Sequence, residues 1–400
     1  MKNKRLVLSV FYMCFFFSLT CASPIDFSCG NIRITVEEYT GAVSLYRKIN
    51  PEIIEDEKKQ DELTKEDNTE SPIIKRYTGA AGTKFGALPE SSYILAKEKD
   101  TADKRIQWEP LLDTSRYTSN TAYYVLLDSG VFKLARSASM QIDASVNAKE
   151  NTVRVDFTLK KIAKITVLMH VFSSKPDVPA DSIHVELIMK NLKDTESFMA
   201  IKAVYDTYLG EGFKYHFSTA NKDAIDSEIV FEDMSTEKWI CSQNATASIR
   251  FLLHGDTITS PRSATLANKD VFLTNTWQPP AKIGRRFNSL FSYNNSALSI
   301  IWKPVYVASE KTAVLGYYIT TSERGAEPAA YENVKAAMKK ETVAMTGSTI
   351  ESSDAFIDYE YIQKLLNRIE QLGLEPDKAD PTEIEYLKRE VEDIIQQLEQ

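Results

Sequence analysis

The sequence of 400 residues predicts a mainly β protein: a large antiparallel β-sandwich, or two tandem sandwiches, followed by a C-terminal α-helical hairpin. Three observations lead to this fold class. Segments rich in Val, Ile, Thr, Tyr and Phe recur between residues 24 and 324, with short polar connections and no interleaved helical period. Hydrophobic residues form 43% of the chain, which is enough for a sizeable core. After residue 325 the apolar residues recur with the spacing of helices.

The strand predictions rest first on alternation of apolar and polar residues. Asn31–Val36 has a period of two, and a turn at Thr40 and Gly41 leads to Ala42–Tyr46, which predicts a hairpin. The later candidates share β-branched and aromatic residues and are Ala122–Leu127, Val131–Leu134, Thr152–Leu159, Lys164–Phe172, Ser182–Met189, Ala200–Tyr208, Ser227–Phe231, Ala247–Leu253, Ala297–Trp302 and Thr312–Thr320. The region exceeds the ~100 residues of one immunoglobulin-like domain, which favours a large two-sheet sandwich or two domains in tandem.

Residues 51–71 interrupt the strands, because charged residues dominate there and aromatic residues are absent. The few apolar residues, Ile53, Ile54 and Leu63, could bury little surface. We therefore expect a mobile, solvated insertion, with an acidic docking loop as the alternative.

The region 325–400 is predicted to be a helical appendage. Pro328–Met345 indicates one helix, while Phe356–Leu372 and Thr382–Leu398 indicate two more, separated by a glycine and a proline. The last two helices form an antiparallel hairpin with one apolar ridge each. The ridge residues are Ile362, Leu366, Ile369, Leu372, Ile384, Leu387, Val391, Ile394 and Leu398. We expect these ridges to pack on the chain's own sandwich, on a second copy as a coiled coil, or on another protein.

The first 23 residues have the layout of a secretory signal peptide. Three basic residues within the first five positions precede the apolar run Leu6–Leu19, and small residues follow at Cys21, Ala22 and Ser23. The run is shorter than the ~20 residues of a membrane-spanning helix. We therefore expect an exported protein of the periplasm or outer cell envelope, with an uncleaved N-terminal anchor as the alternative.

Cys21 raises the question of a lipid anchor, since a lipoprotein signal ends in a cysteine that becomes acylated. The preceding residues, Ser18, Leu19 and Thr20, depart from the usual Leu-x-(Gly/Ala)-Cys pattern. Cleavage one or two residues later fits better. Acylation of Cys21 stays as the alternative, and only then would the protein be held at a membrane.

Charge and cysteine content restrict the partners and the compartment. The formal net charge is −8, and without the three basic residues of the signal 45 basic residues face 56 acidic ones, about −11. This balance excludes nucleic acid as an expected partner, since such binding needs clustered positive charge. Beyond the signal only Cys29 and Cys241 remain. They could form one disulfide in an oxidising compartment or stay as two buried thiols, and both readings are open.

Motifs of established chemistry are missing from the sequence. The four histidines, His170, His184, His216 and His254, lie in no HExxH motif and have no metal-ligand spacing. No GxSxG, P-loop or GxGxxG motif occurs. We therefore expect no cofactor, no metal and no catalytic residue.

The segment Val204–Phe217 is the most unusual one, because acids and aromatic residues crowd around a Gly-x-Gly turn. Asp206 and Glu211 could be paired carboxylates for glycoside chemistry, with Tyr208 as a platform for a sugar ring. The two acids could also bind calcium. The simplest interpretation is a hairpin corner whose acids cap backbone amides and whose aromatic residues fill the core.

A second dense stretch contains Trp277, Arg285 and Arg286. An indole beside two guanidinium groups could line a groove for a carbohydrate or a peptide. The alternative is a long inter-strand loop shaped by its prolines and asparagines, with the tryptophan in the core.

The strand-turn-strand from Gly30 to Tyr46 resembles the opening of large sugar-binding supersandwich domains. The resemblance implies a carbohydrate-binding or carbohydrate-active β-sandwich protein, although the paired His and Glu of mutarotase-like chemistry are not recognisable in the sequence. Our main expectation is a non-catalytic periplasmic or envelope protein. It would bind or scaffold a protein partner, or self-associate, through its C-terminal helices. The carbohydrate interpretation is the alternative.

Overall fold

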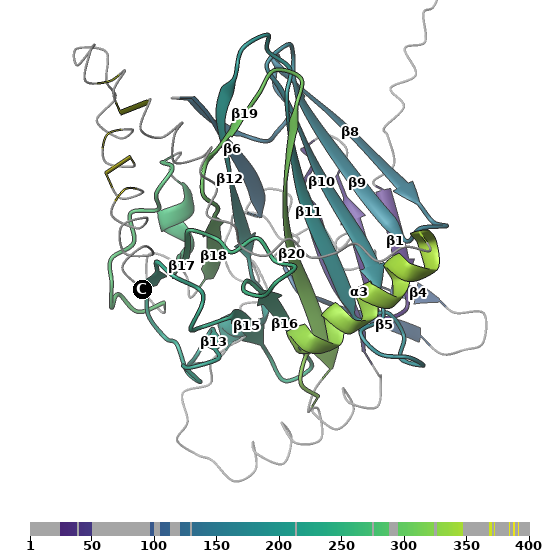
Figure 1. Cartoon of the computed structure of the whole chain (residues 1–400). Coiled ribbons are helices and arrows are strands. Elements are labelled where there is room, and N and C mark those ends of the chain that lie inside the picture. Colours follow the sequence, from purple (N-terminus) through teal and green to yellow (C-terminus); the bar gives the residue numbers. More distant parts are fainter. Residues whose placement is uncertain are drawn as a thin grey trace, which may run out of the picture.

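The computed structural model describes residues 25–37, 40–49, 97–99, 105–112, 121–128, 130–212, 214–273, 276–287, 295–323 and 326–346. It also describes the single positions 368, 369, 372, 384, 387, 388 and 391. The described strands lie between Ile25 and Glu323 and form three antiparallel sheets (Figure 1).

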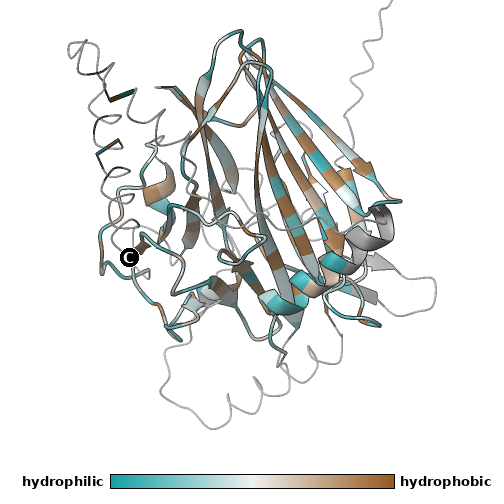
Figure 2. Ribbon diagram, viewed as in Figure 1, coloured by the Kyte–Doolittle hydropathy of each residue, from teal (hydrophilic) through white to brown (hydrophobic). Residues whose placement is uncertain are grey.

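The largest sheet has eight strands and forms the front layer in Figure 1. In spatial order these are β13 (Ser218–Thr219), β15 (Trp239–Gln243), β16 (Ala247–Leu252), β20 (Thr312–Glu323), β11 (Ser182–Asn191), β10 (Ala163–Phe172), β9 (Thr152–Leu159) and β8 (Met140–Asn147). The long strands alternate hydrophobic and hydrophilic residues (Figure 2), so that one face of the sheet is apolar.

The second sheet has seven strands and packs behind the first (Figure 1). Its path is β14 (Ile229–Phe231), β17 (Ser263–Asn268), β18 (Ser296–Ile301), β12 (Ser197–Asp206), β6 (Ala122–Leu127) and β7 (Gly130–Lys133), and β19 (Val305–Val307) pairs with one end of β12. The central strands of this sheet are almost fully buried. A central strand such as β12 has sheet on both sides and can therefore position side chains firmly on either face.

The core lies between these two sheets. The ring centroid of Tyr205, on β12, lies 4.8 Å from that of Phe251, on β16. The Tyr205 ring also contacts the Tyr123 ring edge-on, with 6.1 Å between the two centroids. The Tyr205 hydroxyl is hydrogen bonded to those of Tyr123, at 3.1 Å, and Tyr317. Burial raises the pKa of all three phenols, so they stay neutral and form a satisfied polar chain inside an apolar core.

A third sheet lies behind the β8–β10 part of the eight-stranded sheet in Figure 1. It contains β1 (Ile25–Cys29), β2 (Ile32–Val36), β3 (Val43–Ile49), β5 (Arg105–Pro110) and β4 (Lys97–Lys99). The turn between β1 and β2 packs on the segment before β11, where a Cβ on Gly30 would lie 2.2 Å from the Ala180 nitrogen. Gly30 also has a φ of +58°, which favours glycine. Arg47 of β3 donates to the Thr321 hydroxyl at 2.7 Å, which ties this sheet to β20.

One helix, α3 (Tyr331–Thr346), crosses the lower end of the eight-stranded sheet in Figure 1. Val334 is fully buried, and the Tyr331 hydroxyl accepts a hydrogen bond from the Thr257 amide at 2.9 Å. Gly255 makes room for this contact, because a Cβ there would lie 2.3 Å from the Tyr331 ring. The helix is therefore docked by one ring, one hydroxyl and one buried aliphatic side chain.

The predicted fold class, a mainly antiparallel β-sandwich, is confirmed. The predicted strands Ala122–Leu127 and Thr152–Leu159 coincide with β6 and β9. By contrast, β8, β15 and β17 lie outside the predicted strands. Four of the six residues of β17 are Ser, Ala or Asn, which have low β propensity, and the strand is extended because it pairs with β14 on one side and β18 on the other.

The interpretation of Val204–Phe217 as a hairpin corner is wrong. β12 pairs with β6, β18 and β19, whereas the next strand, β13, pairs with β15 in the other sheet. The chain therefore crosses between sheets here through a short 3₁₀ helix, η1 (Leu209–Gly212). Local turn residues alone could not distinguish a crossing from a hairpin.

Five of the predicted ridge residues lie at described positions, and all five are helical: Ile369, Leu372, Ile384, Leu387 and Val391. Leu387 is buried, while Ile369 and Ile384 are exposed. The remaining ridge residues (Ile362, Leu366, Ile394 and Leu398), the insertion 51–71 and the signal peptide 1–23 lie outside the described residues. Within the described part of the chain, no helix has the length and apolar character required to cross a membrane.

Candidate functional site

Strand β12 divides its side chains between the two faces of the seven-stranded sheet. Ala203 and Tyr205 face the core, so Lys202, Val204 and Asp206 lie on the opposite face. Lys202 and Asp206 are 3% and 0% exposed. Two buried charges on one strand are unusual, because burial of a charge costs free energy unless other groups compensate it.

Two aromatic rings and one carbonyl surround the ammonium group of Lys202. Its Nζ lies 4.3 Å from the ring centroid of Tyr124, its register neighbour on β6, and 5.7 Å from that of Trp277. It donates a hydrogen bond of 2.6 Å to the carbonyl of Thr276. Burial lowers the pKa of the Lys202 ammonium to about 8. We call Tyr124, Lys202, Thr276 and Trp277 the Lys202 site.

An apolar cluster, distinct from the main core, includes two residues of this site. Its buried members are Tyr124, Val204, Ala267, Val271, Phe272 and Ala297, and the partly buried Ala122, Val131, Trp277 and Ala281 pack against them. Thr276 is exposed and Trp277 is half-buried. The ammonium group therefore lies close to the surface although its own atoms are covered.

Asp206 is held by an ion pair at the end of β12. Its Oδ2 lies 2.9 Å from Nζ of Lys269, the first residue of the 3₁₀ helix η2 (Lys269–Leu273). Its backbone amide donates to the Thr121 hydroxyl at 3.0 Å. The carboxylate thus ties η2 to the sheet, which is a structural use of its charge.

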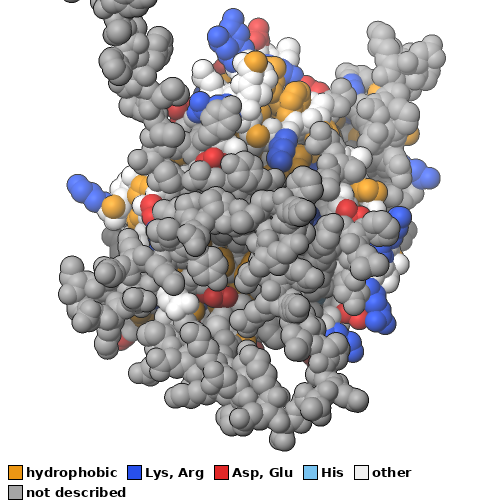
Figure 3. All heavy atoms as spheres, turned by 180° about the vertical axis from the view of Figure 1, so that it is seen from behind, with side chains coloured by type: hydrophobic (Ala, Val, Ile, Leu, Met, Phe, Trp, Pro, Cys, Tyr) orange, Lys and Arg blue, Asp and Glu red, His pale blue; other side chains and the backbone are white. Residues whose placement is uncertain are grey.

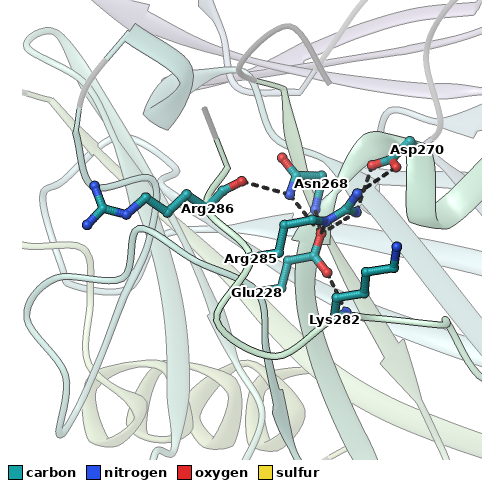
Figure 4. A network of polar contacts seen from close by, with 6 residues as sticks. All are labelled: Glu228, Asn268, Asp270, Lys282, Arg285 and Arg286. Carbon is teal, nitrogen blue, oxygen red and sulfur yellow. Dashed lines mark hydrogen bonds and ion pairs between the residues drawn. The ribbon is translucent and has the colours of Figure 1, made fainter. Parts of the chain in front are cut away.

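Glu228 is the centre of a second polar network (Figure 4). Its fully buried carboxylate accepts hydrogen bonds from the backbone and side-chain nitrogens of Asn268, from the Lys282 amide at 2.6 Å and from Arg285 Nε at 2.7 Å. Arg285 also forms a two-pronged contact with Asp270, both distances being 2.9 Å. The hydrogen bond with Asp270 makes the largest contribution to raising the pKa of Arg285, and Glu228 raises it further. The buried carboxylate is therefore satisfied by hydrogen bonds and a paired cation.

This network fixes the segment 276–287 on the sheet. The Glu228 amide donates to the Arg285 carbonyl at 2.8 Å, and the Gly284 amide donates to the Glu228 carbonyl at 2.9 Å. Four contacts from three residues of the segment, Lys282, Gly284 and Arg285, thus converge on one glutamate. Trp277 belongs to the same segment, five residues before Lys282.

The structure separates the predicted ligand-binding residues into groups. Trp277 belongs to the Lys202 site, while Asp206 and Arg285 serve the two ion-pair networks beside it. Arg286 contributes its carbonyl to Asn268, and its side chain points away from the network (Figure 4). Tyr208 is exposed before η1, and Glu211 is half-buried on η1.

Sequence reasoning missed Lys202, Tyr124 and Glu228. A signal for Lys202 was present, because it is the single charged side chain inside the apolar run from Phe198 to Tyr205. Glu228 had no comparable signal, since its partners come from β17 and from a loop more than fifty residues further along the chain.

Within the described ranges, the remaining histidine and cysteine side chains form no comparable site. His170 and His184 are register partners on β10 and β11, and the pKa of His184 is lowered to about 4, first by burial and then by His170. Among the residues that the structure describes, no group of three or more His, Cys, Asp or Glu could hold a metal. Cys29 and Cys241 are free thiols, so the disulfide considered from the sequence is not formed in this structure. Burial raises the pKa of the Cys241 thiol to about 11.

Positive charge is scattered over the described surface. In the view from behind, Lys and Arg side chains lie at the upper end and along both sides, interspersed with acidic and hydrophobic ones (Figure 3).

Comparison with known proteins gives matches in structure only. No protein-family model matches the chain, and no curated protein matches its sequence. A galactose mutarotase related enzyme from Lactobacillus acidophilus is 6% identical, with a TM-score of 0.37, over 77% of this chain and 100% of that protein. A galactose mutarotase-like protein from Lactobacillus casei is 9% identical, with a TM-score of 0.38, over 75% and 100%. A putative aldose 1-epimerase from Escherichia coli K12 is 6% identical, with a TM-score of 0.37, over 75% and 99%.

These matches contradict the expectation of a non-catalytic envelope protein that scaffolds a protein partner. Four of the solved structures to which the chain is similar are named as galactose mutarotase-related or mutarotase-like proteins or as a putative aldose 1-epimerase, and the scaffold interpretation is wrong. Identities below 10% identify no catalytic residue and no substrate here.

Proposed function

We propose that the chain recognises a carbohydrate at the Lys202 site. The supporting observation is that two aromatic rings and a hydrogen-bonding ammonium group meet at one place near the surface. A sugar ring has apolar C–H faces and a rim of hydroxyls, so it is bound well by an aromatic surface with a few placed polar groups. The half-buried Trp277 offers the aromatic surface, and the Lys202 ammonium group offers hydrogen-bond donors.

The rigidity of the surrounding elements supports the same proposal. Lys202 stands on a central strand, and Glu228 anchors the segment that contains Trp277. A site whose parts are held before the ligand arrives loses less conformational entropy on binding. The Glu228 network therefore acts as a support for Trp277.

The test is titration of the full chain with neutral mono- and oligosaccharides, followed by calorimetry and tryptophan fluorescence. Trp277→Ala should weaken binding at least about tenfold, because the aromatic contact area is lost. Trp239→Phe is the control, since Trp239 lies on β15 in the other sheet and packs against Arg250. Binding that is unchanged in Trp277→Ala, or the absence of saccharide binding in the wild type, would refute the proposal.

Proton-transfer catalysis on the bound sugar is a second candidate function, and the lowered pKa of Lys202 favours it. An amine with a pKa near 8 exchanges protons readily at neutral pH, as a general acid or base must. Polarimetry of anomer interconversion of glucose and galactose would compare the wild type with Lys202→Met. A wild-type rate equal to that in buffer would exclude this activity for these sugars.

We also propose that the chain is exported, which is supported by the signal-peptide layout of residues 1–23. N-terminal sequencing of the protein from an extracytoplasmic fraction should give a start near Ala22 or Ser23. Incorporation of labelled palmitate that Cys21→Ala abolishes would instead establish lipid anchoring. An intact Met1 in a cytoplasmic fraction would refute export.

A further inference from the structure

Among the residues that the structure describes, the Lys202 ammonium group has no carboxylate partner. Its contacts are the Thr276 carbonyl and the faces of the Tyr124 and Trp277 rings. A buried cation without a counter-ion is costly, because aromatic faces and one carbonyl replace only part of its hydration. Such uncompensated groups are concentrated at functional sites, where the ligand completes them.

The acidic groups of the neighbouring elements are already engaged. Asp206, on the same strand, is paired with Lys269. Glu228 and Asp270 are both paired with Arg285. None of these three carboxylates therefore neutralises Lys202.

The hydrogen-bonding capacity of Lys202 is also incomplete. An ammonium group has three donors, and Thr276 accepts one of them. A second lysine also lies near Tyr124: the Nζ of Lys133, on β7, is 6.0 Å from the centroid of the Tyr124 ring. The region therefore has two lysines around one ring, within a chain whose overall charge of −8 repels anions.

We propose that the ligand of the Lys202 site is an acidic saccharide, whose anionic group pairs with Lys202 while a sugar ring contacts Trp277. This inference rests on the proposed carbohydrate binding and specifies its ligand class. A carboxylate or a sulfate ester has the required chemistry, because each presents oxygen acceptors with negative charge. Lys133 strengthens the local positive field for the same group.

The experiment compares matched acidic and neutral sugars on the full chain by calorimetry: galacturonate with galactose, glucuronate with glucose, and galactose 6-sulfate with galactose. We expect the acidic member of a pair to bind at least about tenfold more tightly, since one charge-assisted hydrogen bond has that effect. The affinities for the uronates and for the sulfate ester, compared with each other, show whether the site binds a carboxylate or a sulfate group more tightly. Lys202→Met should abolish the preference, and Lys190→Met is the control, because Lys190 lies on β11 and pairs with Glu310.

A pH series on the wild-type protein tests the same inference without any substitution that could impair folding. As Lys202 loses its proton above pH 8, the affinity for the acidic sugar should fall up to tenfold per pH unit, while that for the neutral sugar stays constant. Tyr124, whose pKa is raised by burial, stays neutral in this range. The other neighbours are Ile301 of β18, which is apolar, Lys133 of β7 and the ion-paired Asp206.

The outcomes separate this inference from the proposed function. Equal affinity for acidic and neutral sugars, with Trp277→Ala still impaired, would overturn the anionic ligand and leave carbohydrate binding intact. A preference retained by Lys202→Met would also overturn it. Failure of every sugar to bind the wild type would overturn both.

Discussion

Replacement of Glu228 by glutamine tests whether one buried carboxylate anchors the segment 276–287. The carboxylate accepts four hydrogen bonds, from two nitrogens of Asn268, from the Lys282 amide and from Arg285 Nε. Glutamine retains one oxygen, but its NH₂ group would then face the Lys282 amide, so that two donors meet. The perturbation is nearly isosteric and acts on charge and hydrogen bonding alone.

The expected loss of stability is about 3 kcal/mol. One buried donor left without an acceptor costs ~1–3 kcal/mol. Loss of the charge opposite Arg285 adds ~1 kcal/mol, less than for an isolated buried pair, because Asp270 still neutralises Arg285. The sum corresponds to a change in the folding equilibrium of roughly a hundredfold.

The assay is urea unfolding followed by circular dichroism and tryptophan emission. Asp270→Asn is the matched control, since the Asp270 side chain is 37% exposed and its pair should contribute less than ~1 kcal/mol. A loss below ~0.5 kcal/mol in Glu228→Gln, or equal losses in the two variants, would show that Glu228 is not the anchor.

Three further predictions concern the core, acid stability and the docking of α3. Tyr205→Phe should destabilise by about 2 kcal/mol, because the hydroxyls of Tyr123 and Tyr317 both lose their shared partner, whereas Tyr215→Phe, at an exposed ring, should have no effect in the same unfolding assay. His184 has a pKa of about 4 in the folded chain against 6.5 when unfolded, so the unfolded state binds more protons between these values and stability falls as the pH drops from 6.5 to 4. The contribution of His184 to the free energy of unfolding is about 3 kcal/mol at most. His184→Phe should remove this contribution from the pH dependence of the unfolding midpoint. An unchanged pH dependence would contradict its assignment to His184. Gly255→Ala should undock α3, because the new Cβ would meet the Tyr331 ring, and faster amide exchange in Tyr331–Thr346 measures this. Tyr331→Phe, which loses only its hydroxyl contact with Thr257, should produce a smaller increase, and the reverse order would be inconsistent with steric docking.

Much of the sandwich could be predicted from local patterns. The alternation in Thr152–Leu159 and the β-branched run in Ala122–Leu127 are properties of neighbouring residues, so they identify strands without knowledge of partners. The strand β17 could not be found this way, because its extended form depends on pairing with β14 and β18. The crossing after β12 depends in the same way on which sheet receives the next strand.

The sequence by itself determined the fold class and marked Trp277, Asp206 and Arg285 as unusual, because composition and periodicity are local properties. Only the tertiary structure decided what these residues do. It assigned Asp206 and Arg285 to ion pairs and placed Trp277 beside Lys202, a residue that sequence reasoning had passed over. The physical reason is that the site depends on strand register and on a loop anchored by Glu228, and these contacts join segments far apart in the chain.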